Sequence, residues 1–338
     1  MINFSQPSPG LAQPSPDLSP SAGQTSRFCK DVLAGLIATP KYLSSKYFYD
    51  KIGDRLFQQI MRTPEYYLFE CEREIFRTHI GRLAGLMTEP GTDFHLIELG
   101  AGDGSKSVGL LEHLTEAGAR FTYTPIDISP NMISYLETWL PATVPGLKTN
   151  GLAGEFFPML QKLPSADRKV VLFLGSTLGN MSPGEARKFC RELRSHLRAG
   201  DMALIGLDLK KNPDIILAAY NDKTGITKQF NLNLLVRINR ELGADFDPAN
   251  FDHFPMYDPL SGACNSYLVS RTEQVVRIQC NGGTKPIQFE RNEEIFMEIS
   301  QKYTIRQIDY LANQASFATV QHFYDSRQWF VDALWLAV

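Results

Sequence analysis

Four short runs of apolar and β-branched residues, each followed by a helical pattern, constrain the fold of this chain more than any other feature. The runs are His95–Leu99, Phe121–Ile126, Lys169–Leu174 and Met202–Leu207. Short apolar runs that alternate with amphipathic helices predict parallel strands joined by crossover helices. A parallel sheet has to be covered on both faces, so we expect an α/β core built around such a sheet.

The last part of the chain adds an antiparallel element. After a helical pattern from about Ile305 to Ala315, two strand-like runs, Ala318–Tyr324 and Trp329–Val338, flank the polar turn at 325–327. A closing hairpin here would insert an antiparallel strand into the parallel sheet. The resulting topology resembles that of class I methyltransferases with a Rossmann-like sheet, whereas nucleotide-dependent dehydrogenases usually lack the hairpin.

Two regions precede the sheet. Residues 1–26 are rich in Pro, Ser, Gln and Gly, and this composition predicts a disordered tail because the segment cannot bury enough apolar surface to offset the entropy of ordering. Helical patterns, broken at Pro64, occupy residues 27–87. We assign residues 88–208 to the sheet core that follows.

The regular alternation stops after Asp208. Helical patterns continue to about Leu242, and two extended segments, Asn265–Ile278 and Lys285–Ser300, then follow, joined around a Gly282-Gly283 turn. We interpret residues 209–300 as an inserted α+β substrate-binding domain and expect it to form a lid together with residues 27–87. Residues 301–338 return to the core.

The composition narrows the class of partner. A chain of 338 residues with 43% hydrophobic residues can bury a large core. Its net charge of -3 argues against nucleic acid, because binding to phosphates needs an excess of Lys and Arg. We therefore expect a small neutral or zwitterionic substrate, and the sequence is compatible with a monomer.

Cysteine usage and hydropathy suggest a compartment. The five cysteines contain no C-x-x-C pair, so we expect neither a disulfide framework nor a zinc site, which favours the cytoplasm. No apolar run approaches the roughly 20 residues of a membrane span, and the amino terminus lacks a basic segment followed by an apolar one. None of the six histidines falls in a ligand-like spacing, so no metal is expected.

The glycine-rich loop after the first strand is the main candidate for a cofactor site. Glu98 lies at the carboxyl end of the strand, and Gly100, Gly102 and Gly104 follow the strand. Glycines at this place allow a tight turn and let a ligand approach the backbone. The dinucleotide pattern G-x-G-x-x-G would need a glycine where this chain has Ser105, which weakens the case for NAD. The alternative is a tight strand-to-helix turn with no ligand.

Two acids downstream fit an adenosine ligand. Asp127 ends the next strand, roughly 25 residues after the loop, where an acid accepts hydrogen bonds from ribose hydroxyls. Glu155 and Phe156 precede the third strand and could hold the adenine amino group and ring. The alternative for this pair is an exposed Glu and a core Phe.

Several longer stretches resemble one family, the histidine Nα-methyltransferases of ergothioneine biosynthesis, together with relatives that methylate prenylated tryptophan in fungi. The resemblance covers nearly everything after residue 27. The stretches that carry it are Tyr47-Phe48-Tyr49-Asp50, Thr63-Pro64-Glu65-Tyr66-Tyr67, the loop 98–106, Leu174-Gly175-Ser176-Thr177-Leu178-Gly179-Asn180, Ala219-Tyr220, Phe230-Asn231-Leu232-Asn233, Asn239-Arg240-Glu241-Leu242-Gly243-Ala244-Asp245-Phe246 and Glu298-Ile299-Ser300.

The resemblance implies an S-adenosylmethionine-dependent enzyme that methylates the α-amino group of a free amino acid, with histidine, which would become trimethylhistidine, as the leading acceptor. It also implies which residues surround the cofactor. An aromatic face near a sulfonium is favourable, and Glu155 stands where family members usually carry Asp. The implied cofactor residues are Tyr49, Gly100, Gly102, Lys106, Asp127, Glu155 and Phe156.

For the acceptor, the resemblance places Asn180 and Tyr220 at the backbone groups of the amino acid, and these two with Tyr49 are the expected catalytic residues. Tyr66, Glu298 and Ser300 would surround the imidazole, since a carboxylate beside an imidazole fixes its tautomer. Each also has an ordinary structural interpretation, as a core tyrosine, a turn asparagine or a solvated strand residue.

The segment at Asn265-Ser266 departs from the family. Histidine-specific relatives carry Glu-Met there, so Ser266 would leave the side-chain pocket larger or more polar. An N-methyltransferase for tyrosine or a tryptophan derivative is therefore the alternative function. A nucleotide-dependent oxidoreductase and a non-catalytic S-adenosylmethionine-binding protein are the rival classes.

Overall fold

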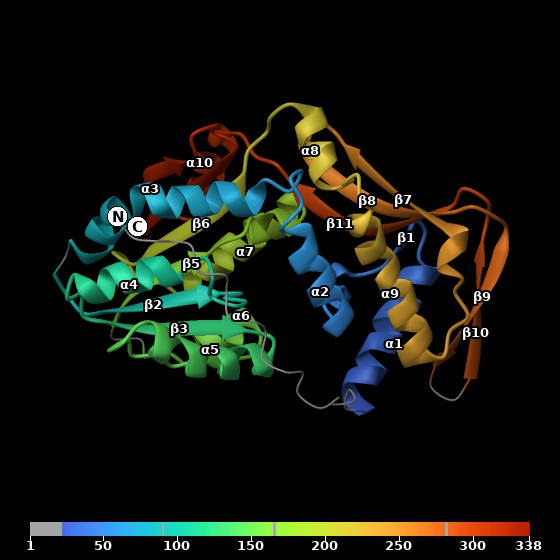
Figure 1. The fold of residues 1–338 in the computed structure, drawn as a ribbon, viewed down its shortest axis with the longest axis horizontal. Helices are drawn as coiled ribbons and strands as arrows, with labels where there is room; N and C mark the ends of the chain where they lie inside the picture. Colours follow the sequence, from blue (N-terminus) through green and yellow to red (C-terminus); the bar gives the residue numbers. More distant parts are fainter. Residues whose placement is uncertain (1–21, 90, 165–166, 281–282) are drawn as a thin grey trace.

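The computed structural model describes residues 22–338 except 90, 165–166 and 281–282 (Figure 1). The expected tail therefore lies outside the described residues up to residue 21. Residues 22–26 of the expected tail belong instead to helix α1 (Ala22–Ile37).

The larger sheet has seven strands in the order β12-β13-β6-β5-β2-β3-β4. Strands β6, β5, β2, β3 and β4 run parallel, while β13 pairs antiparallel with both β6 and β12. This is the predicted Rossmann-like methyltransferase sheet with its closing hairpin, and the fold class is confirmed. The strands are β2 (Phe94–Leu99), β3 (Phe121–Asp127), β4 (Leu152–Ala153), β5 (Arg168–Phe173), β6 (Met202–Asp208), β12 (Phe317–Tyr324) and β13 (Phe330–Ala337).

Helices cover both faces of this sheet, as a parallel sheet requires. Successive residues of β2 face opposite sides: Leu96 belongs to the core under α3, α4 and α5, and Ile97 to the core under α7 and α10. Strands buried on both faces explain the continuous apolar runs in the sequence. The helices are α3 (Leu68–Thr88), α4 (Val108–Glu116), α5 (Pro130–Thr143), α6 (Phe156–Leu160), α7 (Pro183–Ser195) and α10 (Ile305–Gln314).

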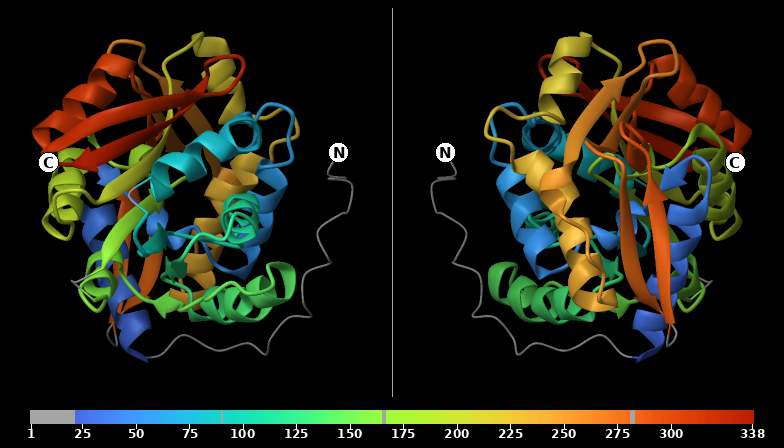
Figure 2. Two further views of the ribbon diagram at one scale, coloured as in Figure 1. Left: turned by 90° about the vertical axis from the view of Figure 1, so that its left-hand side faces the viewer. Right: turned by 90° about the vertical axis from the view of Figure 1, so that its right-hand side faces the viewer.

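A second unit stands beside the carboxyl ends of these strands (Figure 1 and the right-hand view of Figure 2). Its core joins residues from two distant parts of the chain, 28–60 and 230–297, among them Phe48, Phe230, Leu268 and Ile295. A four-stranded sheet has the order β1-β11-β8-β7, and β9 pairs with β10. The elements are α1, β1 (Lys41–Tyr42), α2 (Lys51–Ile60), α8 (Pro213–Ala219), α9 (Ile226–Leu242), β7 (Phe251–Tyr257), β8 (Ala263–Ser270), β9 (Gln274–Cys280), β10 (Gly283–Phe289) and β11 (Glu294–Gln301).

The strands of this unit differ from those expected. Each of the two extended segments is divided into two strands, so β8 pairs with β11 while β9 and β10 form a separate hairpin. Strand β7 was not predicted at all. It is an edge strand that exposes Phe254 and Met256 and contains Pro255, and edge strands tolerate both features. Part of the expected Gly282-Gly283 turn lies outside the described residues.

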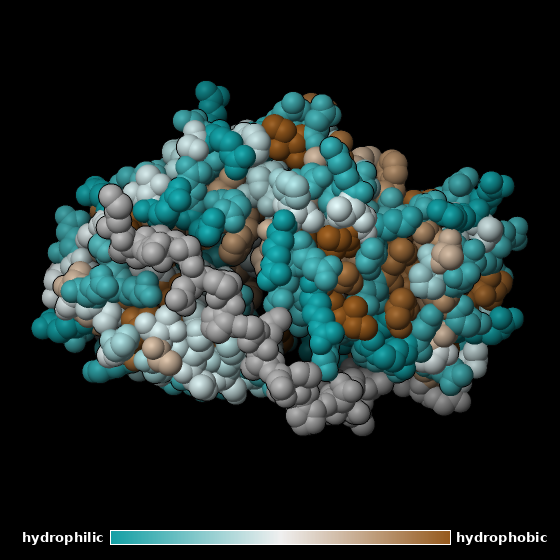
Figure 3. Space-filling model, in the orientation of Figure 1, coloured by the Kyte–Doolittle hydropathy of each residue, from teal (hydrophilic) through white to brown (hydrophobic). Residues whose placement is uncertain are grey.

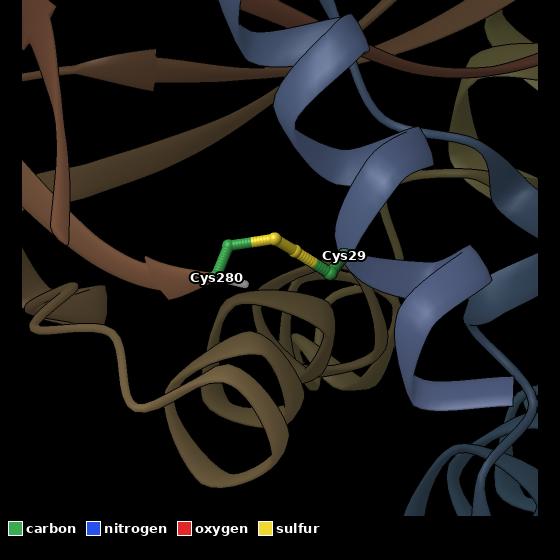
Figure 4. Close-up of a disulfide and its surroundings, with 2 residues drawn as sticks. All are labelled: Cys29 and Cys280. Atoms are coloured by element: carbon green, nitrogen blue, oxygen red, sulfur yellow. A yellow bond between two sulfur atoms is a disulfide. The ribbon is translucent and has the colours of Figure 1, made fainter. Parts of the chain in front are cut away.

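A disulfide connects Cys29 of α1 with Cys280 at the end of β9 (Figure 4), and the two Cα atoms are 6.1 Å apart. The expectation of no disulfide was wrong. The two residues are separated by 251 positions, and only the packing of α1 against the rest of the second unit brings them together. Cys71, Cys190 and Cys264 are free and buried.

The surface in Figure 3 is mostly hydrophilic, with exposed apolar side chains gathered over α2 and α9. Ile52 of α2 and Val236 of α9 are both more than two-fifths exposed. Single exposed apolar side chains are ordinary in globular proteins. Within the described part of the chain, no helix is long and apolar enough to cross a membrane.

Candidate active site

The glycine loop and Asp127 form one hydrogen-bonded unit at the carboxyl end of the large sheet. Gly100 and Gly102 have φ values of 74° and 54°, in the region that favours glycine. The Asp127 carboxylate accepts hydrogen bonds from the backbone N–H groups of Gly102 at 3.1 Å and Ser129 at 2.9 Å. Asp127 is half-buried, so part of its carboxylate stays accessible beside the loop.

Phe156 lies over the same loop. A Cβ atom on Gly100 would be 3.7 Å from its ring, so the missing side chain leaves a narrow space between ring and backbone. The ring also packs against Phe173 of β5. An aromatic face, a carboxylate and glycine backbone at one sheet edge are the groups that an adenosine ligand requires, and S-adenosylmethionine fits this arrangement.

Glu155 is at the start of α6 and is exposed. It forms a 3.7 Å ion pair with Arg27 of α1. Exposed ion pairs contribute little stability, so this carboxylate is free to exchange partners. Its position shows that α1 of the second unit reaches the expected adenine end of the site.

Lys106 is held by a buried carboxylate. Its Nζ atom is 3.0 Å from Glu72 of α3, and the other oxygen of Glu72 accepts the N–H of Gly175 at 2.7 Å. The charges of Glu72 and Lys106 also act on Asp332 of β13. Burial and Glu72 raise the pKa of Asp332 well above its usual range. The pairing therefore fixes Lys106 beside the loop that follows β5.

That loop carries Asn180 toward the second unit. It runs through the short 3-10 helix η2 (Thr177–Asn180), and the backbone at Gly179 is so close to Gln301 that a Cβ atom would be 3.0 Å from the Gln301 carbonyl. Asn180 is exposed at the end of η2. The loop thus brings Asn180 next to the end of β11.

Strand β11 and helix α8 bring several of the predicted acceptor residues together. The hydroxyl groups of Tyr220, which follows α8, and Ser300, in β11, are 2.6 Å apart. Glu298 lies directly opposite Ser266 in the pairing of β11 with β8. Tyr220, Ser266 and Ser300 are buried, and Glu298 is partly buried.

The carboxyl group of Glu298 is a weaker acid than that of an ordinary glutamate. Burial raises its pKa to about 7, while the charge of Lys302 and the hydroxyl of Ser266 act in the opposite direction. Burial also raises the pKa of Tyr66 well above its usual range, and the charges of Lys302 and Glu298 act on the same phenol. Tyr66 is therefore a neutral hydrogen-bond donor that belongs to the same cluster.

Tyr49 completes the group from the side of α2. It is 48% exposed and makes edge contacts with Phe57 and Phe230, at 5.6 and 5.8 Å between ring centroids. Close by, burial and the carboxylates of Asp50 and Asp127 raise the pKa of Asp54 to about 6. Asp54 was not singled out from the sequence, although it links α2 electrostatically to the glycine loop.

Sequence reasoning also missed a charged cluster behind Tyr220, formed by Asp208, Lys211, Lys302 and Tyr67. A signal existed for Asp208, because it directly follows the predicted strand Met202–Leu207, at the edge of the sheet where ligands bind. The other three residues carry no local signal. No group of His, Cys, Asp and Glu side chains suited to holding a metal ion occurs within the described ranges.

Comparison with known proteins gives a consistent result. The model of the family described as histidine-specific, S-adenosylmethionine-dependent methyltransferases matches residues 28–337. The histidine N-alpha-methyltransferase of Mycolicibacterium smegmatis is 37% identical over 274 residues, which cover 81% of this chain and 84% of that protein. Ergothioneine biosynthesis protein 1 of Schizosaccharomyces pombe is 28% identical over 83% of this chain and 37% of its own length. The L-tryptophan methyltransferase of Psilocybe serbica is 26% identical over 87% of this chain and 88% of its own length.

Proposed function

The chain belongs to the family of histidine-specific, S-adenosylmethionine-dependent methyltransferases, and from this premise we propose that it methylates the α-amino group of free histidine. That it is an S-adenosylmethionine-dependent N-methyltransferase follows from the family. The observation that carries the choice of histidine is Glu298, a partly buried carboxyl that lies opposite Ser266 beside the tyrosine and serine hydroxyls. A carboxylate in such a place can accept the N–H of an imidazole and fix its tautomer.

The residues have distinct proposed roles. S-adenosylmethionine, when bound, supplies an electrophilic methyl group. Asp127, Glu155 and Phe156 would hold its adenosine part. The Tyr49 ring, half-exposed beside Phe230, would face the positive charge of the sulfonium.

The acceptor amine must be neutral to accept a methyl group. The α-amino pKa is about 7.7–8.0 in peptides and higher in a free amino acid, so the neutral form is a minority near neutral pH. We assign orientation of that form to the Asn180 amide, whose oxygen would accept an N–H of the amine and so direct the nitrogen lone pair toward the methyl group. Tyr220 would bind the carboxylate, and the rate acceleration would come mainly from alignment of the reacting atoms.

We further propose that the second unit, formed by parts of residues 27–87 and 209–300, acts as the acceptor-binding lid. Its shared core and the Arg27–Glu155 ion pair across the two units support this role. We also propose that the enzyme is a cytoplasmic monomer that does not bind nucleic acid. Three free buried thiols suit a reducing compartment, while the Cys29–Cys280 bond is the feature that argues against it.

The decisive experiment is a methyl-transfer assay over the twenty amino acids, combined with binding of S-adenosylhomocysteine and NAD by calorimetry. We expect S-adenosylhomocysteine alone to bind and histidine to have the highest kcat/KM. Tyrosine or tryptophan turnover well above that of histidine would refute the histidine assignment.

Ser266→Met should keep or modestly raise the activity on histidine, because it recreates the wall that histidine-specific relatives have at this place. Ser266 is buried opposite Glu298, so the larger side chain reduces the space beside the carboxylate. We expect activity on tyrosine and tryptophan to fall by roughly 10- to 200-fold, which corresponds to the roughly 1–3 kcal/mol that small shape changes in a pocket contribute. Kinetics on the three amino acids in parent and variant measure this, and Ser266→Thr is the matched polar control.

The titration of Glu298 should appear in the pH dependence. Burial raises its pKa to about 7, so the carboxylate that accepts the imidazole N–H forms only as the pH rises through that value. We expect the ratio of parent to Glu298→Gln kcat/KM for histidine to rise between about pH 6 and 8 and then stay constant. Ionisation of the substrate cancels in this ratio. A ratio that is flat over the same range would contradict the role of Glu298.

A further inference from the structure

A buried group of charges lies directly behind Tyr220 and Ser300. Lys302 follows β11, its side chain has no exposed surface, and its Nζ atom is 2.7 Å from Oδ2 of the equally buried Asp208. Lys211 pairs with the other oxygen of the same carboxylate and contacts the Tyr67 hydroxyl at 2.8 Å. Two ammonium groups therefore share one carboxylate.

This arrangement leaves one positive charge without a full partner inside the protein. Uncompensated buried charge is costly, so a cluster with an excess of positive charge favours an anion beside it. The charge of Glu298 also acts on Lys302, but no ion pair or hydrogen bond joins these two side chains among the contacts of the described residues. Among the described groups that bond to this cluster, the hydroxyl pair of Tyr220 and Ser300 belongs to the predicted acceptor site.

The hydrogen bonds of Lys302 determine what this hydroxyl pair can do. An ammonium group has three N–H donors and no acceptor. Besides Asp208, Lys302 donates to the Tyr220 oxygen at 2.7 Å and to the Ser300 oxygen at 2.8 Å, so all three donors are used. The two hydroxyl oxygens therefore each accept a hydrogen bond from Lys302.

The two hydroxyl groups also bond to each other, at 2.6 Å. One of them therefore donates to the other, whichever way that bond is directed. One hydroxyl proton then remains without a partner among these groups. The pair consequently offers a hydrogen-bond donor, backed by a positive charge, to whatever lies beside it.

We propose that Lys302 is a positioning residue that directs the Tyr220–Ser300 hydroxyl pair to donate to the α-carboxylate of the acceptor. This assigns Ser300 to the carboxylate, whereas the family resemblance had implied a place beside the imidazole. The inference rests on the proposed function, and it defines the acceptor class as amino acids with a free carboxylate. Histidinamide, which replaces that carboxylate with a neutral amide, is then a poor substrate.

The test compares histidine with histidinamide in the parent, K302M and K211M. We expect the parent to prefer histidine by about 100-fold in kcat/KM, and K302M to reduce this preference to tenfold or less by raising KM for histidine while kcat stays within about threefold. K211M is the matched control, since Lys211 belongs to the same cluster and contacts Tyr67 instead of Tyr220. Its preference should stay within about threefold of the parent.

Binding of S-adenosylhomocysteine verifies that each variant is folded. Because K302M leaves Asp208 with fewer partners, D208N/K302M is measured beside it and should show the same loss of preference. A parent that methylates histidinamide as well as histidine, or a folded variant lacking Lys302 that keeps the parent's preference, overturns the proposal. If the parent methylates another amino acid instead of histidine, only the histidine assignment fails, and the same comparison is made with that amino acid and its amide.

Discussion

Glu298→Ala should lower kcat/KM for histidine by about 100-fold. A hydrogen bond to a charged group contributes about 1.5–3 kcal/mol, and every 1.4 kcal/mol corresponds to about a factor of ten. Glu298 lies opposite Ser266 in the β8–β11 pairing, where no other carboxylate of these two strands can replace it. Its loss would leave the imidazole N–H without an acceptor. Steady-state kinetics with histidine measure the effect.

The effect should be selective for the acceptor. Affinity for S-adenosylhomocysteine should change by less than about twofold, because Glu298 lies on β11 and the glycine loop follows β2. Glu298→Gln keeps the shape and an acceptor oxygen and should retain more activity than the alanine variant. Equal losses on histidine and on tryptophan, or an equal loss of cofactor affinity, would show that Glu298 supports the fold and does not recognise the imidazole.

Asp127→Ala should weaken binding of S-adenosylmethionine by about 100-fold or more. Two charge-assisted hydrogen bonds to ribose hydroxyls are worth about 1.5–3 kcal/mol each. The substitution also removes the acceptor for the N–H groups of Gly102 and Ser129, which shape the glycine loop. Isothermal titration with S-adenosylmethionine and S-adenosylhomocysteine gives the affinity directly.

Asp103→Ala is the matched control for this variant. Asp103 lies in the same loop and is exposed, and its carboxylate accepts only the nearby N–H of Ser105 among the hydrogen bonds described, at 3.0 Å. We expect its removal to change the affinity by no more than about threefold. An Asp127→Ala variant that binds the cofactor as well as the parent would contradict the assignment of Asp127 to the ribose hydroxyls.

The charged cluster behind Tyr220 shows how the two units depend on each other. Asp208 ends β6 of the large sheet, while Lys302 follows β11 of the second unit. Truncation of one partner of a buried ion pair leaves the other charge uncompensated, which is strongly destabilising. The arrangement therefore couples the position of the proposed acceptor residues to the frame that carries the glycine loop.

The sequence by itself determined the large sheet and the likeness of its first loop to an adenosine site. Strands β2, β3, β5 and β6 were predicted to within about two residues because a buried parallel strand is a continuous apolar run, which is a local property. The Gly100–Gly102 turn and Asp127 were found for a similar reason. Glycines that need positive φ, and an acid at a strand end, are visible in a few consecutive residues.

Only the tertiary structure decided how the second unit is built. The edge strand β7 has no regular alternation of buried and exposed residues and contains a proline, so its residues carry no strand signal. The division of the extended segments into β8 to β11 depends on which strands pair, and pairing is a contact between distant residues. The Cys29–Cys280 bond spans 251 positions for the same reason.

The residues of the candidate site also divide into those that the sequence indicated and those that only the tertiary structure revealed. Family resemblance indicated Tyr220, Glu298 and Ser300, but it gave no reason to select Lys302 or Lys211, since a lysine next to a strand is usually a solvated side chain. Their burial against Asp208 arises where the end of β6 meets the end of β11. Local chemistry can be read along the chain, whereas the desolvation that gives these charges their effect exists only after distant segments have packed together.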